Sequence, residues 1–119
     1  MHDTKLYQEL DRFLIDADIR IASGHSTSEW LGGDYTTVYI RRTRHWIHDR
    51  SQLTLDIANI FIEEEFRGNG IFTNMLEWLM ARGYPVYVEN VLNTRLKVFL
   101  ELNTFEKLGT TPHSYFKNC

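Results

Sequence analysis

The chain has 119 residues, of which 43% are hydrophobic and 24% charged, and its formal net charge is -3. This length supports one hydrophobic core and is too short for two, so we expect a single domain over residues 1–119. The net charge gives no general reason to expect binding to nucleic acid or to an anionic membrane. Cys119 is the only cysteine, which excludes an internal disulfide and fits a reducing compartment.

The first residues are polar and charged, without the apolar core of a signal peptide, and no apolar run is long enough to span a bilayer. We therefore expect a cytoplasmic protein with no membrane partner.

Residues 5–17 predict an amphipathic helix, and residues 19–22 predict a short strand. Residues 23–34 are rich in Gly and Ser and predict a loop. The helix has its apolar stripe at Leu6, Leu10, Phe13, Leu14 and Ala17.

Residues 35–47 and 52–62 are rich in β-branched and aromatic side chains and predict a hairpin of two strands. The second strand changes phase along its length: its apolar residues are Leu53, Leu55 and Ile57, then Ile60 and Ile62. Because side chains alternate with a period of two, a strand with a buried face cannot change phase without an irregularity. The phase change predicts a β-bulge near Ala58 and Asn59, which would free backbone groups for an extended ligand.

A turn with two glycines, Gly68 and Gly70, follows this strand and three carboxylates, and it leads into a predicted helix over residues 70–81. A helix N-terminus presents unpaired N–H groups and the positive end of the helix dipole, and Arg67 adds a full charge. The turn is therefore a candidate phosphate site. The alternative is an ordinary strand-to-helix turn in which the glycines supply only backbone freedom.

The rest of the chain predicts a mixed sheet. Gly83 suits the position after a helix end, and residues 86–88 predict a short strand that runs parallel to the earlier one because a helix separates them. Asn93 is expected to cap the next helix, and residues 105–111 and 114–117 predict two final strands. The fold class is mixed α/β or α+β, a central sheet with flanking helices.

Two stretches resemble the GNAT superfamily of acetyl-CoA-dependent N-acetyltransferases. The run IFIEEEFRGNGIF resembles the family signature Gln/Arg-x-x-Gly-x-Gly/Ala, with matches at Arg67 and Gly70 and a departure at Phe72. Residues 93–105 resemble a second family block, in which an Asn opens a helix. The resemblance covers roughly residues 53–110 and implies a GNAT-like fold and transfer of an acetyl group from acetyl-CoA to a primary amine.

The resemblance also implies the cofactor site. The pyrophosphate of acetyl-CoA would lie on the N–H groups of residues 67–72, and the pantetheine arm would pair with the backbone of residues 60–62 like an added strand. No metal is expected. The residues assigned to acetyl-CoA are Ile60, Phe61, Ile62, Arg67, Gly68, Asn69, Gly70, Ile71, Phe72, Thr73 and Asn93.

The attacking amine must lose a proton, and Glu63 and Glu89 are the candidate bases because both follow strand ends at the same edge of the sheet. Many relatives carry a tyrosine acid seven residues after the Asn, where this chain has Leu100. Either the thiolate departs without an acid, or Tyr87 or Tyr115 substitutes, or activity is impaired. The alternative function is a non-catalytic acyl-CoA-binding or interaction module with the same fold.

The acceptor would be an amine on a small molecule or a protein, and the edge strands leave room for a homodimer. A basic stretch in the hairpin favours a solvated edge hairpin over a nucleic-acid surface. His45 and His48 do not form a convincing metal pair, because no Cys or carboxylate is expected to complete a set. The stretch comprises Arg41, Arg42, Arg44, His45, His48 and Arg50.

Overall fold

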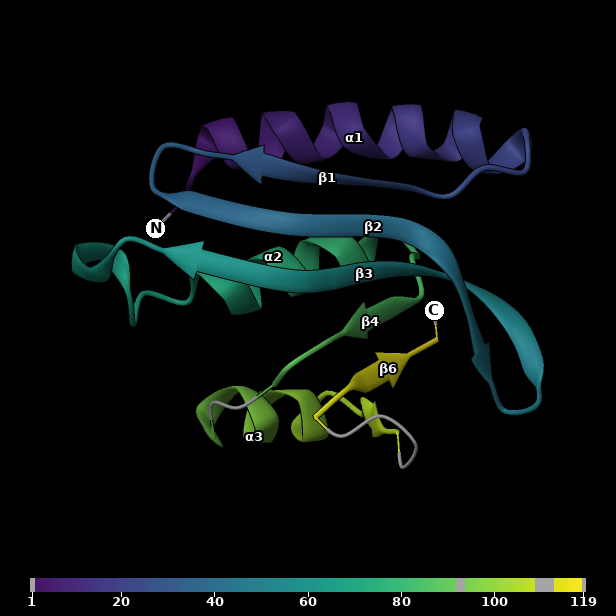
Figure 1. Ribbon diagram of the computed structural model, residues 1–119. Helices are drawn as coiled ribbons and strands as arrows, with labels where there is room; N and C mark the ends of the chain where they lie inside the picture. The colour runs from purple at the N-terminus through teal and green to yellow at the C-terminus, as the bar shows by residue number, and fades with distance from the viewer. Residues whose placement is uncertain (1, 92–93, 109–112, 119) are drawn as a thin grey trace.

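The computed structural model describes residues 2–91, 94–108 and 113–118. Its sheet has six strands in the order β1-β2-β3-β4-β6-β5; among the described pairs, β3 and β4 are parallel and the others antiparallel (Figure 1). The elements in chain order are α1 (Thr4–Ala22), β1 (Thr27–Gly32), β2 (Thr36–Ile47), β3 (Arg50–Ile62), the 3-10 turn η1 (Glu64–Phe66), α2 (Ile71–Ala81), β4 (Val86–Val88), α3 (Thr94–Leu102), β5 (Glu106–Lys107) and β6 (Tyr115–Lys117).

Helix α1 buries the predicted apolar stripe but is longer than predicted, so the expected short strand over residues 19–22 is wrong. The helix ends at Ala22, and Gly24, just beyond its C-cap Ser23, has a φ of 82° and donates its N–H to the Ile21 carbonyl oxygen. A glycine with positive φ is a common helix end. The apolar residues before it therefore continue the helix, and Ile19 remains exposed.

The loop expected over residues 23–34 is also wrong, because it contains strand β1. Every residue of β1 pairs with β2, from Thr27 opposite Arg42 to Gly32 opposite Thr37. Its alternate residues face solvent, and Leu31 is buried. Backbone pairing with β2 supplies the hydrogen bonds whatever the side chains are, which is why polar residues and glycine are tolerated in this edge strand.

The carboxylate of Asp3 joins the start of α1 to the turn between β1 and β2. Asp3 is 1% exposed, and its Oδ1 accepts the N–H groups of Leu6 (3.2 Å) and Asp34 (2.8 Å), while Oδ2 accepts the Tyr35 N–H (3.1 Å). Burial alone would raise the pKa of Asp3, but these backbone hydrogen bonds outweigh it and hold the pKa below its ordinary value. Asp3 thus fixes α1 against the sheet.

The bulge predicted in β3 is confirmed. Tyr39 of β2 lies opposite Asn59 and the next residue, Ile40, lies opposite Ile57, so Ala58 has no partner on β2. Because of this extra residue, Ile60 lies on the same face of the sheet as Ile57 and packs against the core. Residues 48 and 49 form the hairpin turn, with φ of 52° and 61°.

The two faces of the sheet differ. One face packs against α1, α2 and α3 in the main core, which includes Leu10, Ile40, Leu55, Leu76 and Leu100. The opposite face carries a small cluster of Ile47, Tyr87 and Phe116 and, beside it, polar residues of β2 and β3. In Figure 1, α1 runs along β1 while α2 passes behind β2 and β3.

The predicted helix end at Gly83, whose φ is 83°, and the parallel pairing of β3 with β4 are both confirmed. The last two strands are shorter than expected within the part of the chain that the structure describes. No described helix has both the length and the apolar character needed to cross a membrane.

Candidate functional site

A cavity of about 290 Å³ lies where β3 and β4 separate. Their pairing ends at Ile57 opposite Val88, followed by one hydrogen bond from the Glu89 N–H to the Ile57 carbonyl oxygen (3.0 Å). Beyond it the bulge at Ala58 bends β3 away from β4. The described lining residues are Ile57, Ala58, Asn59, Ile60, Phe72, Val88, Glu89, Asn90 and Leu96.

Two further hollows, of about 380 and 310 Å³, extend this cavity toward the glycine turn. All three share Ile60; the second also reaches Gly68 and Thr73, and the third follows residues 60–62 to Arg67. The three hollows therefore form a path from Glu89 along the bulged strand to the N-terminus of α2. A path of this shape suits a long, narrow ligand with an anionic end.

The glycine turn is held in place by its own side chains. Gly70 caps α2 with a φ of 74°, and the first helical bond runs from the Asn74 N–H to the Gly70 carbonyl oxygen (2.9 Å). The N–H groups of residues 71–73 precede that bond and have no helical acceptor. Arg67 Nε donates to the Ile62 carbonyl oxygen (2.7 Å), and Asn69 Nδ2 donates to that of Phe66 (3.0 Å).

The structure brings together most residues assigned to acetyl-CoA. Ile60, Phe61, Ile62, Arg67, Gly68, Phe72 and Thr73 line one or more of the three hollows. Asn69 and Gly70 are exposed in the turn, Ile71 is buried, and Asn93 lies outside the described residues. Phe72, the departure from the family signature, packs against the core and forms a wall of two hollows.

The two candidate bases differ in position. Glu89 lines the cavity at the bulge, with its side chain 23% exposed. Glu63 is exposed before η1, where its N–H bonds the Tyr35 carbonyl oxygen, and it is absent from the described lining of all three hollows. Of the two, Glu89 is the one that lines the cavity.

No tyrosine is among the described residues that line the cavity. Leu100 is buried in the core. Tyr115 is buried too, and its burial, together with the nearby Glu101 carboxylate, raises its pKa. Tyr87 stacks on the ring of His45, with centroids 4.0 Å apart. Neither tyrosine proposed as a substitute acid lies at the cavity wall.

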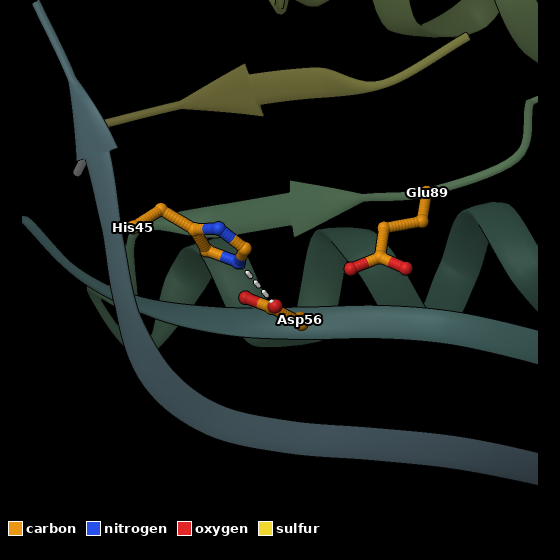
Figure 2. A group of neighbouring side chains, drawn as sticks. All are labelled: His45, Asp56 and Glu89. Carbon is orange, nitrogen blue, oxygen red and sulfur yellow. Dashed lines mark hydrogen bonds and ion pairs between the residues drawn. The ribbon is translucent and has the colours of Figure 1, made fainter. Parts of the chain in front are cut away.

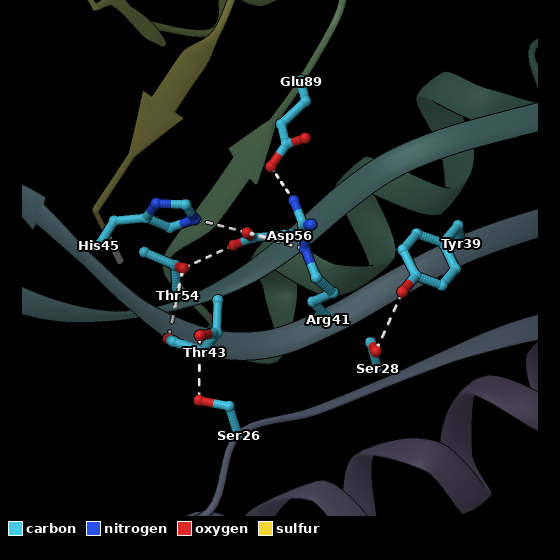
Figure 3. Close-up of polar contacts among 9 residues, drawn as sticks. All are labelled: Ser26, Ser28, Tyr39, Arg41, Thr43, His45, Thr54, Asp56 and Glu89. Atoms are coloured by element: carbon cyan, nitrogen blue, oxygen red, sulfur yellow. Dashed lines mark hydrogen bonds and ion pairs between the residues drawn. The ribbon is translucent and has the colours of Figure 1, made fainter. Parts of the chain in front are cut away.

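Next to the cavity, a polar cluster centres on Asp56, whose carboxylate is completely buried. Oδ1 accepts the Thr54 hydroxyl (2.5 Å), and Oδ2 lies 2.5 Å from His45 Nε2 and 3.6 Å from Arg41 Nε. Arg41 Nη2 forms an ion pair with Glu89 Oε1. Figure 3 shows Arg41 between the two carboxylates, reaching from β2 toward the end of β4.

The solvated edge hairpin preferred for the basic stretch is wrong for part of it. Strand β2 is paired on both sides as far as Arg42, where its pairing with β1 ends, and beyond that it pairs with β3 alone. Arg41 and Arg42 therefore lie in the interior of the sheet, on opposite faces. Arg42 is buried, with its guanidinium 4.9 Å from the Tyr84 ring and its Nε 3.4 Å from Asp18 Oδ1. Arg41 belongs to the polar cluster, and Arg44 is exposed.

The expectation that no carboxylate accompanies His45 is also wrong. One nitrogen or oxygen atom from each of His45, Asp56 and Glu89 lies within 4.8 Å of the other two. Figure 2 shows the three side chains as neighbours on the sheet. Arg41 provides the positive charge between the two carboxylates. His48 does not join this group and pairs with Glu106 (2.8 Å). The one signal in the sequence that points to this cluster is Asp56 itself, a carboxylate in the middle of a strand, between the apolar residues Leu55 and Ile57.

Neither the family models nor the curated proteins include a match to this chain. Solved structures do resemble it. A mutant AtaT toxin bound to the C-terminus of the antitoxin AtaR is 12% identical with a TM-score of 0.52, and the same complex with acetyl-CoA is 14% identical with a TM-score of 0.51. The comparison covers 71% of this chain, which spans only 58% of the AtaT chain.

The KacTA–DNA complex gives a similar result over more of the chain. It is 17% identical with a TM-score of 0.51, covering 93% of this chain and 79% of the other. At identities this low, the structural similarity establishes the architecture alone, and the activity has to be argued from the site. The expected fold class, a mixed sheet with flanking helices of the GNAT-like type, is confirmed.

Proposed function

We propose that this protein is an N-acetyltransferase that moves an acetyl group from acetyl-CoA to a primary amine of a small molecule or a protein. The observation that carries the proposal is the series of three neighbouring hollows from the bulge at Ala58 to the N-terminus of α2, with Glu89 in the innermost one. The acetyl-CoA in one of the similar AtaT structures supports this choice of ligand.

The residues along the path fit acetyl-CoA. N–H groups at the start of α2, with the helix dipole, would hold the phosphates, and Arg67 would add charge. Residues 60–62, past the bulge, would hold the pantetheine arm through backbone hydrogen bonds. When bound, acetyl-CoA supplies an activated acetyl thioester.

Glu89 would then act as the general base for the acceptor amine. A primary amine has a pKa of about 10 and is charged at neutral pH, so it must lose a proton before it reacts. The Glu89 carboxylate can take that proton directly or through one water molecule. A backbone N–H at the bulge, where Ala58 has no partner on β2, could donate a hydrogen bond to the thioester carbonyl oxygen as negative charge develops on it. Holding both groups in the same cavity supplies much of the remaining rate enhancement.

The proposal is tested first by binding. Acetyl-CoA should raise the melting temperature of the wild type, and Gly70→Glu should remove that shift because its carboxylate would face the phosphates. Gly83→Glu is a matched control, since Gly83 has a similar positive φ and open space around it but lies after the other end of α2. A Gly70→Glu variant that still binds acetyl-CoA would contradict the assigned phosphate site.

The second test is turnover. Release of CoA thiol is followed with a panel of small amines and lysine-containing peptides, in a Cys119→Ser background so that the protein has no thiol of its own. We expect release with at least one amine, and a large loss of turnover in Glu89→Gln with little change in acetyl-CoA binding. Binding without release on any amine would instead support an acyl-CoA-binding module.

A further inference from the structure

The burial of Asp56 requires an explanation beyond stability. Its carboxylate is 0% exposed on the sheet face that also carries the apolar cluster of Tyr87 and Phe116. Removing a carboxylate from water is costly, and an apolar side chain in its place is often equally stabilising. Asp56 instead has three polar partners, Thr54, His45 and Arg41, and only Arg41 extends to the cavity residue Glu89.

Arg41 contacts two carboxylates through different nitrogens. Its Nε lies 3.6 Å from Asp56 Oδ2, and its Nη2 pairs with Glu89 Oε1. Arg41 Nε is buried and has no hydrogen-bond partner among the described residues other than this ion pair with Asp56. The guanidinium is planar and rigid, so fixing it at one end also fixes the other.

Among the described residues, Glu89 is held through one carboxylate oxygen. Oε1 pairs with Arg41, whereas Oε2 makes no hydrogen bond within the described ranges of the chain. Glu89 also lines the cavity at the bulge. One carboxylate oxygen is therefore anchored and the other is available to a ligand.

We propose that Asp56 and Arg41 are positioning residues for Glu89: Asp56 orients the Arg41 guanidinium, which holds the Glu89 carboxylate at the cavity. The expected effect on turnover rests on the proposed function, whereas the effect on geometry does not. Thr54 and His45 complete the arrangement, because their hydrogen bonds leave the Asp56 carboxylate little freedom to rotate.

Two variants test this chain of contacts. Asp56→Asn keeps the shape of the side chain but removes its charge, and Arg41→Lys keeps the charge but replaces the fork by a point charge. Asp49→Asn and Arg44→Lys are matched controls, since both residues are exposed in the same hairpin. Arg41 is partly exposed, so Arg41→Lys tests the proposal even if Asp56→Asn fails to fold.

Crystal structures of the wild type and of each variant that folds give the first measurement, which needs no activity. We expect the Glu89 carboxylate to leave its wild-type position in Asp56→Asn and Arg41→Lys, but not in the controls. A Glu89 carboxylate that keeps its position in Arg41→Lys, and in Asp56→Asn where that variant folds, would overturn the proposal.

Kinetics give the second measurement. With an amine that the wild type acetylates, kcat should fall about 10- to 100-fold in Arg41→Lys and Asp56→Asn, while the Kd for acetyl-CoA stays unchanged. A purely structural role would weaken both together. Unchanged kcat in both variants, with Glu89→Gln impaired, would overturn the positioning role and leave the acetyltransferase proposal standing. If the wild type acetylates no amine, that proposal fails, and the crystal structures alone decide the positioning.

Discussion

Two aspartates of this protein are buried to the same degree but have different partners. Asp3, at the start of α1, accepts hydrogen bonds from backbone N–H groups of Leu6, Asp34 and Tyr35. Asp56, in the middle of β3, is bound by the side chains of Thr54, His45 and Arg41. Backbone donors cannot turn away when their acceptor is lost, whereas side-chain donors can find water or another partner. The comparison separates an aspartate that holds the fold from one that arranges ionisable groups beside a cavity.

The largest loss of stability is expected from changing Asp3, which accepts hydrogen bonds from the backbone. Asp3→Asn removes the charge and keeps only one acceptor oxygen, so its NH2 group faces at least one of the backbone N–H groups, which is left unsatisfied. We expect the free energy of unfolding to fall by about 3 kcal/mol, measured by urea denaturation. Asp34→Ala is the control, because its side chain is exposed and its backbone N–H is kept. A loss below about 1 kcal/mol would show that Asp3 does not hold α1.

The same contact can be disturbed from its other side. A Cβ at Gly33 would lie 2.3 Å from Asp3 Oδ2, whereas at Gly32 it would meet nothing within 4 Å. Gly33→Ala should therefore displace the carboxylate and destabilise the protein by about 2 kcal/mol, while Gly32→Ala should change little. Equal melting temperatures for the two variants would mean that the Asp3 carboxylate moves aside at no cost.

These contacts also show how far the sequence is informative. The bulge at Ala58 and the glycine turn were predictable because each is a local pattern: a change of apolar phase, and glycines before a helix. The partners of Asp3 were not, since Asp34 and Tyr35 are 31 and 32 residues away in the chain. Strand β1 was missed for a related reason, because an edge strand is stabilised by its pairing with β2 more than by its own side chains.

For the cluster around Asp56, the sequence indicates Asp56 itself but not its partners. The sequence shows that Asp56 shares the polar phase of the strand with Gln52 and Thr54. Its partners were not predictable, because Arg41 lies opposite Asp56 only in the observed register, and His45 is opposite Gln52, so its ring reaches Asp56 diagonally across the pair. Contact of Arg41 with Glu89 depends further on the parallel placement of β4.

Asp56, whose partners are side chains, should contribute less than Asp3 to the stability of the fold. Asp56→Asn keeps a hydrogen-bond acceptor for Thr54, and Arg41, which is partly exposed, still has Glu89 as a partner. We expect a loss of about 1 kcal/mol in the free energy of unfolding, well below that of Asp3→Asn in the same urea experiment. A loss equal to or larger than that of Asp3→Asn would remove the distinction between the two aspartates.

The smallest effect expected is the pH dependence of the Asp3 contribution. Hydrogen bonds from backbone N–H groups hold the pKa of Asp3 below its ordinary value of 3.8 despite its burial. A carboxyl group with a lowered folded-state pKa stabilises the protein fully above its unfolded value, and the contribution is lost as the pH falls through the folded-state value. The difference in unfolding free energy between the wild type and Asp3→Asn should therefore be constant from neutral pH down to about pH 5 and shrink below that. A difference that grew on acidification would mean that the folded protein binds a proton at Asp3 more readily than the unfolded chain does, and the backbone donors would then be too weak to hold the start of α1.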